Sequence, residues 1–267
     1  YDPPYNYPAP TKLPAGKLLF QFPEGKNVRS ELSLERAEAV LTIETEQGDI
    51  PVKAFCHAES KSGLIWVGKK ASEFKVKLQN PEFGTNDTKE ELNYNPDERE
   101  ISQGSLKRLH YPLVEKGTEP GEIEFIWFSQ KVDETFSFGI VVGTLETENE
   151  TQIFYRIVTS KDGENWLEDA KLQLREELIA GYEKQLESHM EWWKCFWEKS
   201  TVSVPDPLFE KNWYLTNYLF ASCSRKGFYP MPLQGVWTAD NDKLPPWKGD
   251  YHHDTNTQLS YQSYLKA

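Results

Sequence analysis

The spacing of apolar residues changes once along this chain, near residue 165, and this change constrains the fold more than any other feature. Before it, apolar and polar residues alternate in short segments such as 28–34 and 50–56. A period of two is typical of strands that bury one face. After it, apolar residues recur every three, four or seven positions from Leu167 to Trp197, which places them along one face of a helix. The sequence therefore predicts a β-rich part followed by a helical part.

Residues 1–162 are predicted to form an antiparallel β-sandwich. Turn residues separate many of its strand segments at intervals of about 8–12 residues, the spacing typical of sandwiches. The predicted strands cover 18–22, 28–34, 39–43, 50–56, 64–67, 74–78, 123–128, 136–142 and 153–158. The polar stretch 80–103 is predicted to be a long surface excursion.

Residues 163–204 are predicted to form a helical linker. Its apolar stripe indicates one helix of about thirty residues, which at 1.5 Å per residue would span roughly 45 Å. Two prolines, Pro205 and Pro207, then interrupt the chain, and a second helix is predicted over 208–224. A further helix is expected to begin near Asp254 and to run past the end of the chain.

One short segment, Ser160–Trp166, places an Asp-Gly turn before a tryptophan. Similar patterns occur in sialidase propellers and discoidin modules. Neither of those folds places a long helix immediately afterwards, so we interpret the segment as an ordinary turn.

Composition excludes several classes of function. The 267 residues carry a formal charge of −12, which argues against binding to a nucleic-acid backbone. No stretch of eighteen apolar residues occurs, so no membrane span is predicted. Cys56, Cys195 and Cys223 lack CxxC spacing, which excludes a thiolate zinc site, although two of them could pair. We predict no cofactor, and the sequence does not determine the oligomeric state.

The last forty residues gather the side chains that most resemble a binding site. Trp237 and Trp247 lie in proline-rich loops, where the backbone is stiff. Rigid aromatic faces suit the C–H groups of a pyranose ring. Asp250, His252 and His253 follow within a few residues and supply hydrogen-bond donors and acceptors for hydroxyl groups. The segment therefore predicts a carbohydrate-binding surface.

Each of these residues also has a structural interpretation. Either tryptophan alone could serve packing, and Asp254 could simply cap the terminal helix. Asp250 and Asp254 could also be an acid and base pair. The adjacent histidines point in different directions and lack the i, i+4 spacing of helical zinc sites, so no metal site is predicted. The aromatic run 192–197 continues the helical stripe and is predicted to be core.

Taken together, the sequence resembles the glycoside hydrolase family 95 proteins, whose known activities include α-L-fucosidase. The resemblance is close over roughly the last 75 residues and loose over the first 160. It is carried by Trp192-Trp193, Phe196-Trp197, Ser222, Ser224-Arg225, Pro232-Leu233-Gln234-Gly235-Val236-Trp237, Pro245-Pro246-Trp247 and Tyr251 to Tyr261. It implies an α+β multidomain protein with a β-sandwich, a helical linker and an (α/α)6 toroid, of which residues 205–267 would supply the first helices.

The resemblance also implies a function. The family hydrolyses terminal α-linked sugars with inversion, and its general acid and base lie well downstream of the matched motif. This chain alone is therefore expected to be inactive. Two amide side chains that position the attacking water in the family correspond to Asp254 and Asn256; Asn256 matches, whereas Asp254 replaces the usual asparagine. The expected partner is a carbohydrate, and the expected location is extracellular or periplasmic.

Two alternatives belong to other classes. A non-catalytic carbohydrate-binding or scaffold module would use the same tryptophans and histidines as a sugar platform. A phosphorylase of related architecture would use phosphate, rather than water, as the nucleophile.

Overall fold

The structure is a computed structural model that describes residues 14–23, 25–83, 106, 110–232, 235–236, 251 and 253–262. The chain divides into two compact units. The first, here called the β unit, comprises residues 15–80 and 113–201. The second, here called the helical unit, comprises residues 1–14, 81–112 and 202–267. The β unit ends at Thr201, within the range predicted to be a linker.

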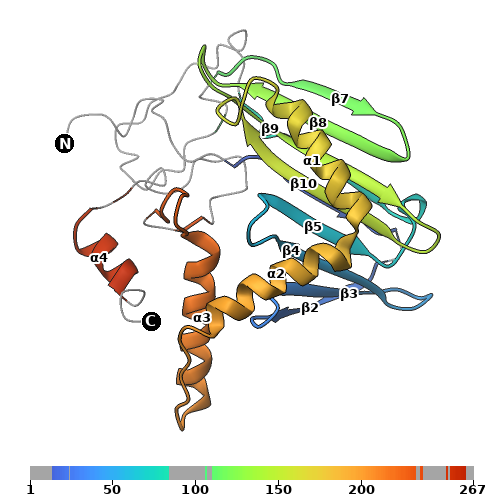
Figure 1. Ribbon diagram of the computed structural model, residues 1–267. Coiled ribbons are helices and arrows are strands. Elements are labelled where there is room, and N and C mark those ends of the chain that lie inside the picture. Colours follow the sequence, from blue (N-terminus) through green and yellow to red (C-terminus); the bar gives the residue numbers. More distant parts are fainter. Residues whose placement is uncertain are drawn as a thin grey trace, which may run out of the picture. The chain divides into compact units, whose positions relative to one another are not determined.

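An eight-stranded antiparallel sheet forms the centre of the β unit, in the order β2-β3-β4-β5-β10-β9-β8-β7 (Figure 1). A second sheet contains only β1 and β6, also antiparallel. The strands are β1 (Lys17–Gln21), β2 (Asn27–Ser33), β3 (Glu38–Glu44), β4 (Ile50–Cys56), β5 (Ser62–Val67), β6 (Lys75–Gln79), β7 (Glu115–Glu119), β8 (Ile123–Lys131), β9 (Ser137–Glu146) and β10 (Thr151–Thr159). The predicted antiparallel β architecture is confirmed, and each predicted strand segment overlaps one of these strands.

The two edge strands of the large sheet differ from the sequence prediction. β7 was not predicted, because its sequence Glu-Lys-Gly-Thr-Glu has no apolar residue; charged residues of this kind discourage pairing at a free edge. β2 was predicted to be half-buried, and this is wrong: Val28 and Leu32 are 55% and 46% exposed. Only one strand flanks β2, so its alternating pattern does not place it in the core.

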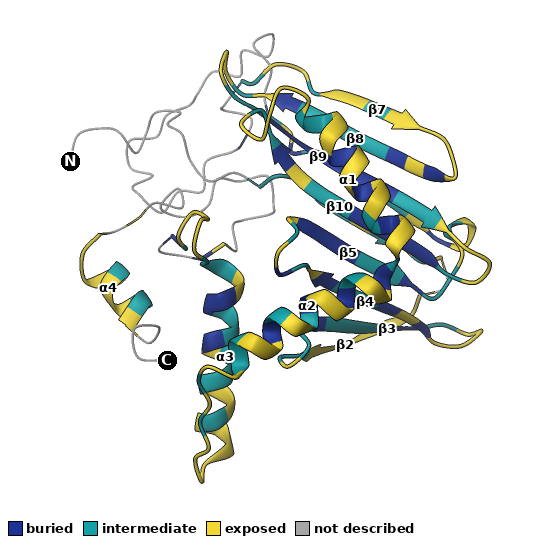
Figure 2. Cartoon of the chain, in the orientation of Figure 1, coloured by how far each residue is buried: buried dark blue, intermediate teal, exposed yellow. Residues whose placement is uncertain are grey.

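Helix α1 (Trp166–Ala180) lies across β9 and β10 (Figure 1). Its buried residues Leu174 and Leu178 belong to the main apolar core, which is dark blue along the central strands in Figure 2. The sheet has a glycine where the helix approaches it: a Cβ added at Gly143 would lie 2.8 Å from Leu178 Cδ1. The absence of that side chain lets the helix pack closely on the sheet.

The prediction of one long helix is wrong. The stripe forms two helices, α1 and α2 (Tyr182–Trp197), which are separated at Gly181. Gly181 has φ of +89°, a left-handed conformation that glycine adopts readily and that ends a helix. Its N–H still bonds the carbonyl of Glu177 at 3.0 Å. The apolar spacing continues across the break because both helices bury residues against the same unit, so periodicity alone did not reveal it.

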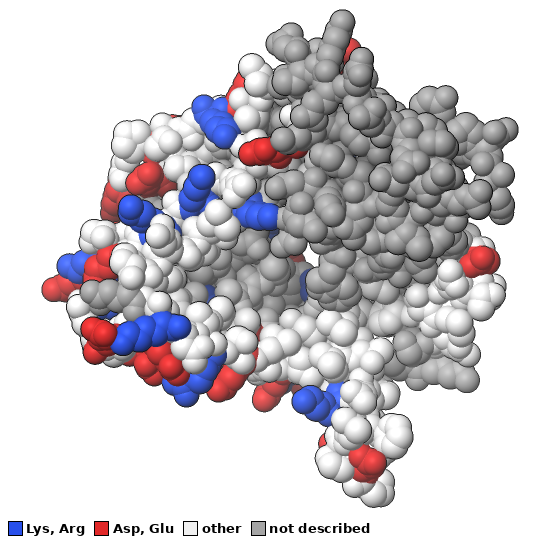
Figure 3. Space-filling model, turned by 180° about the vertical axis from the view of Figure 1, so that it is seen from behind, with Lys and Arg blue, Asp and Glu red and all other residues white. Residues whose placement is uncertain are grey.

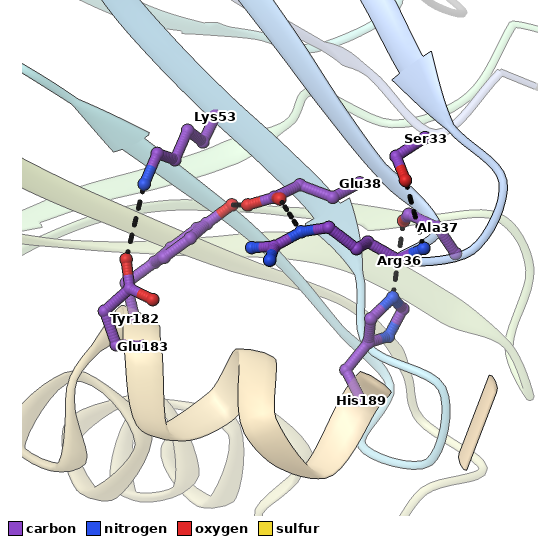
Figure 4. A network of polar contacts seen from close by, with 8 residues as sticks. All are labelled: Ser33, Arg36, Ala37, Glu38, Lys53, Tyr182, Glu183 and His189. Atoms are coloured by element: carbon purple, nitrogen blue, oxygen red, sulfur yellow. Dashed lines mark hydrogen bonds and ion pairs between the residues drawn. The ribbon is translucent and has the colours of Figure 1, made fainter. Parts of the chain in front are cut away.

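Helix α2 is held to the sheet by a network of polar contacts (Figure 4). The Tyr182 hydroxyl donates to Glu38 Oε1 at 3.0 Å, and Arg36 Nε donates to the other oxygen at 2.8 Å. Burial, followed by the charge of Glu38, raises the pKa of Tyr182, so the phenol stays a donor. An ion pair of 3.4 Å joins Lys53 and Glu183 at the helix start.

A buried histidine, His189, forms the second part of this network. Its Nδ1 accepts the N–H of Ala58 at 3.1 Å. Its Nε2 lies 3.3 Å from the Ala37 carbonyl oxygen, a contact drawn in Figure 4. The two contacts require a neutral imidazole with the proton on Nε2. Next to it, His57 Nδ1 accepts two backbone N–H groups, and its Nε2 lies 2.9 Å from Ser188 Oγ. Both histidines therefore join α2 and the loop after β4 in their neutral form.

His189→Ala is expected to lower the free energy of unfolding of the β unit by about 1–3 kcal/mol, because it removes a buried acceptor of the Ala58 N–H. Urea unfolding at neutral pH measures the loss. His253→Ala, at an exposed position in the helical unit, is the control and should leave the stability of the β unit unchanged.

The helical unit contains two described helices. α3 (Pro207–Cys223) begins with Asp206, whose side chain accepts the N–H of Leu208 at 2.8 Å, and confirms the predicted second helix. α4 (Thr255–Gln262) begins where a terminal helix was predicted. None of the helices that the structure describes is long and apolar enough to cross a bilayer.

The surface of the β unit mixes charges of both signs. Figure 3 shows Lys and Arg side chains interspersed with Asp and Glu side chains on the face turned away in Figure 1. Exposed pairs in the β unit include Lys26–Glu46 at 2.7 Å and Arg29–Asp49 at 3.2 Å. Such pairs contribute about 0–1 kcal/mol each, so stability depends on the buried contacts. The three cysteines are free thiols.

Candidate active site

The structure describes three of the predicted site residues: His253, Asp254 and Asn256. The other four lie outside the described residues, namely Trp237, Trp247, Asp250 and His252. The described part of the site is therefore the start of α4 and the segments of the helical unit that it contacts.

Asp254 caps helix α4. Its Oδ1 accepts the N–H of Asn256 at 3.1 Å, and its carbonyl accepts the N–H of Gln258 at 3.1 Å. The cap explains why a helix starts here, since it satisfies a backbone donor that has no partner within the helix. Both Asp254 and Asn256 are exposed, and no described residue bonds the second oxygen, Oδ2, of Asp254. The capping role leaves that oxygen and the amide of Asn256 available to a ligand.

The far end of α4 is tied to the end of α3. Tyr261 donates its hydroxyl to the carbonyl of Met231 at 3.1 Å and lies 3.3 Å from Ser224 Oγ. Its ring also packs edge-on against Phe220, with the ring centroids 5.5 Å apart. Ser224 and Tyr261 both belong to the motif that carries the family resemblance. They position α4, which in turn positions Asp254 and Asn256.

A stacked aromatic pair precedes α4. The rings of Tyr251 and His253 are parallel within 6°, with centroids 5.7 Å apart. The Tyr251 hydroxyl donates to the carbonyl of Pro230 at 2.7 Å. Burial, then the nearby Tyr261 and Tyr229, raises the pKa of Tyr251, so it remains a neutral donor. Sequence reasoning did not assign Tyr251 a role, although its i, i+2 spacing from His253 was visible.

The residues around the start of α4 can bind hydroxyl groups through hydrogen bonds. It combines a carboxylate oxygen, a primary amide and an aromatic pair over four described positions, all exposed at the surface. Within the described residues, no group of three or more His, Cys, Asp or Glu side chains is arranged to hold a metal ion.

A known protein family matches the part of the chain that contains α4. Residues 164–265 match the sequence profile described as the glycosyl hydrolase family 95 catalytic domain. This chain is similar to the family 95 glycoside hydrolases. The match begins at residue 164, so it takes in α1 and α2 together with α3 and α4. The predicted resemblance to family 95 is confirmed.

Two individual proteins are also similar. "Probable alpha-fucosidase A" from Aspergillus niger is 48% identical over 44 residues, which are 16% of this chain and 5% of that protein. A solved structure, "Putative kojibiose phosphorylase from human microbiome", has a TM-score of 0.52 at 9% identity. It covers 82% of this chain, and this chain covers 34% of that structure. The second likeness shows the fold alone. The chain spans only a small part of both relatives.

Proposed function

We propose that this chain is part of a glycoside hydrolase that releases terminal α-linked sugars, α-L-fucose or a related sugar, with inversion of the anomeric carbon. The observation that carries the proposal is the family 95 catalytic match over residues 164–265. The short but close similarity to an α-fucosidase points to the same class of substrate. In this proposal the general acid and base are not among these 267 residues, and α3 and α4 belong to the start of an (α/α)6 toroid.

In this proposal Asp254 and Asn256 orient the attacking water from the first turn of α4. Trp237, Trp247, Asp250, His252 and His253 would bind the sugar. A glycan substrate of this kind also fits an extracellular or periplasmic location.

Asp254 departs from the family pattern at the water-positioning pair, and Gln258, Ser260 and Gln262 also differ from the family's commoner residues. An amide both donates and accepts hydrogen bonds, whereas an ionised carboxylate only accepts. A carboxylate also adds negative charge, which by like-charge repulsion would favour protonation of a neighbouring general base. We therefore expect the water-activating arrangement, or the sugar preference, to differ from that of the fucosidases.

Asp254→Asn tests this difference. In the complete protein, the substitution should change kcat on at least one of a panel of aryl α-glycosides by about tenfold or more, with the gain on the α-L-fucoside, because it restores the amide. The helix should persist, since asparagine caps as well as aspartate. Asp206→Asn, the same change at the cap of α3, is the matched control and should leave the rates unaltered. Equal rates for Asp254→Asn and wild type on every glycoside would refute the idea.

The overall proposal is tested by assaying the complete protein on an aryl α-L-fucoside and related α-glycosides while following the released sugar by NMR. Inversion predicts that the β-anomer is released first, and appearance of the α-anomer first would contradict it. A rate that requires phosphate would instead indicate the phosphorylase alternative. Sugar binding without turnover in the complete protein would favour a binding module. The 267-residue chain alone is expected to show no turnover.

A further inference from the structure

A separate pocket of about 550 Å³ lies in the β unit. Its walls come from the loop after β4 (residues 59–61), the second half of β10 with the turn that follows it, and the first two turns of α1. The volume is within the range of small-molecule sites, which is about 300–1,000 Å³. Every lining residue belongs to the β unit, so this pocket is not part of the candidate site on α4.

The aromatic wall of the pocket is Trp166, the first residue of α1. Its ring packs on the sheet at a glycine: a Cβ added at Gly139 would lie 3.2 Å from Trp166 Cζ3. The ring is half-buried, and its position is set by the sheet beneath it. A fixed, partly exposed indole suits the C–H face of a sugar ring, because it offers contact area at low entropic cost.

Arg156 supplies hydrogen-bond donors to the pocket. Its side chain is only 11% exposed, and Nη1 lies 3.2 Å from Ser62 Oγ and 3.4 Å from Glu177 Oε1. Glu177 balances the charge of Arg156. The Nε of Arg156 and the Oγ of Ser60 are buried, and neither has a hydrogen-bond partner among the described residues. Both Arg156 and Ser60 line the pocket. A guanidinium group only donates hydrogen bonds, so Arg156 in the lining favours a ligand that carries acceptors.

The charges of the lining disfavour an anionic ligand. Lys61 is paired with Asp162 at 3.2 Å. Burial works to raise the pKa of Asp162, but hydrogen bonds from Thr159 and the ammonium of Lys61 outweigh it, so the carboxylate stays ionised. Three anionic and two cationic side chains line the pocket, and one of the cations, Arg156, is already paired with Glu177. Negative charge is therefore in excess, which disfavours an anion. Hydroxyl groups, in contrast, both donate and accept, and can use carboxylates and guanidinium alike.

We propose that this pocket is an accessory binding site for a neutral pyranose, with Trp166 as the stacking surface and Arg156, Asp169 and Gln173 as the hydrogen-bonding residues. Asp169 and Gln173 are four residues apart on α1, which places them on the same side of the helix. The site does not depend on the proposed hydrolase activity, because its ligand class follows from its own lining.

The proposal is tested by titrating the 267-residue chain with methyl α-glycosides and following binding by isothermal calorimetry and NMR. The panel contains the glycosides of L-fucose, D-galactose, D-glucose and D-xylose. At least one neutral glycoside should bind, and methyl α-glucuronide should bind more weakly because of the excess negative charge. Gln173→Ala and Trp166→Phe should each weaken binding by about tenfold or more. Glu176→Ala, an exposed change on the same helix outside the pocket, is the matched control and should not alter the affinity.

Two results would overturn the proposal. One is the absence of binding by every neutral glycoside of the panel. The other is binding that persists in both pocket variants but is lost in His253→Ala, which would place the sugar on the helical unit instead. Circular dichroism of each variant establishes that it is folded, so a loss of binding reports on the pocket. Hydrolysis by the complete protein is measured separately, and either property can fail without the other.

Discussion

Trp193→Ala is expected to lower the free energy of unfolding of the β unit by about 3–5 kcal/mol, the usual cost of removing a large buried aromatic side chain. Trp193 is 1% exposed and is among the largest fully buried side chains of the chain. Its ring packs with the rings of His189, Phe196 and Trp197, at centroid distances of 6.3, 5.4 and 5.8 Å. Truncation would leave a cavity where α2 packs, and the surrounding structure can fill it only in part.

Urea unfolding monitored by circular dichroism measures the effect. The neighbouring Trp192 provides a matched control, because it is the same residue type on the same helix but only half-buried. It stacks on Phe196 with centroids 5.7 Å apart, so Trp192→Ala should cost clearly less. Equal losses for the two variants would mean that burial does not determine the contribution of Trp193.

Glu177→Ala is expected to cost about 3–5 kcal/mol of unfolding free energy, because it leaves a buried charge without its partner. The side chains of Arg156 and Glu177 are 11% and 13% exposed. Glu177 also accepts the hydroxyl of Ser62 at 2.6 Å, so the substitution removes two contacts of the carboxylate. Chemical denaturation at neutral pH measures the loss.

Two further variants separate the charge effect from a general effect on α1. Glu176→Ala changes the adjacent, exposed residue and should stay within about 0.5 kcal/mol of the wild type. Replacing both partners, Arg156→Met with Glu177→Met, should recover most of the lost stability, since apolar residues of similar volume can substitute for a buried ion pair. If the double variant is as unstable as Glu177→Ala, the buried charge is not the cause.

The strands were predictable because alternation is a local property of the sequence. Segments 28–34 and 50–56 carry this alternation, and they correspond to β2 and β4. β7 carries no such pattern, and it exists because β8 offers it a backbone partner. The break at Gly181 was hidden for a related reason. Leu178 and Tyr182 keep a spacing of four across it, so the apolar stripe continues although the helix does not.

The candidate active site was only partly accessible to sequence reasoning. Capping by Asp254 was foreseen as an alternative, because an aspartate before a helix has a local preference for that role. The tie between Tyr261 and Ser224 was not foreseen, since it joins residues 37 positions apart. The pocket at Trp166 was missed entirely: the sequence indicated a turn at 160–166, and nothing local shows that residues 59–61 lie beside it.

The sequence by itself determines that strands come first and helices afterwards, and it contains a family motif near its end. Those properties depend on neighbours within a few positions, where backbone geometry and side-chain periodicity act directly. Three further properties depend on the folded chain. The first is the exposure of the apolar residues on β2, and the second is the position of α2 beside β3 and the loop after β4. The third is the assembly of a pocket around Trp166. Each requires contacts between residues far apart in sequence, and such contacts form only when the sheet and helices pack together.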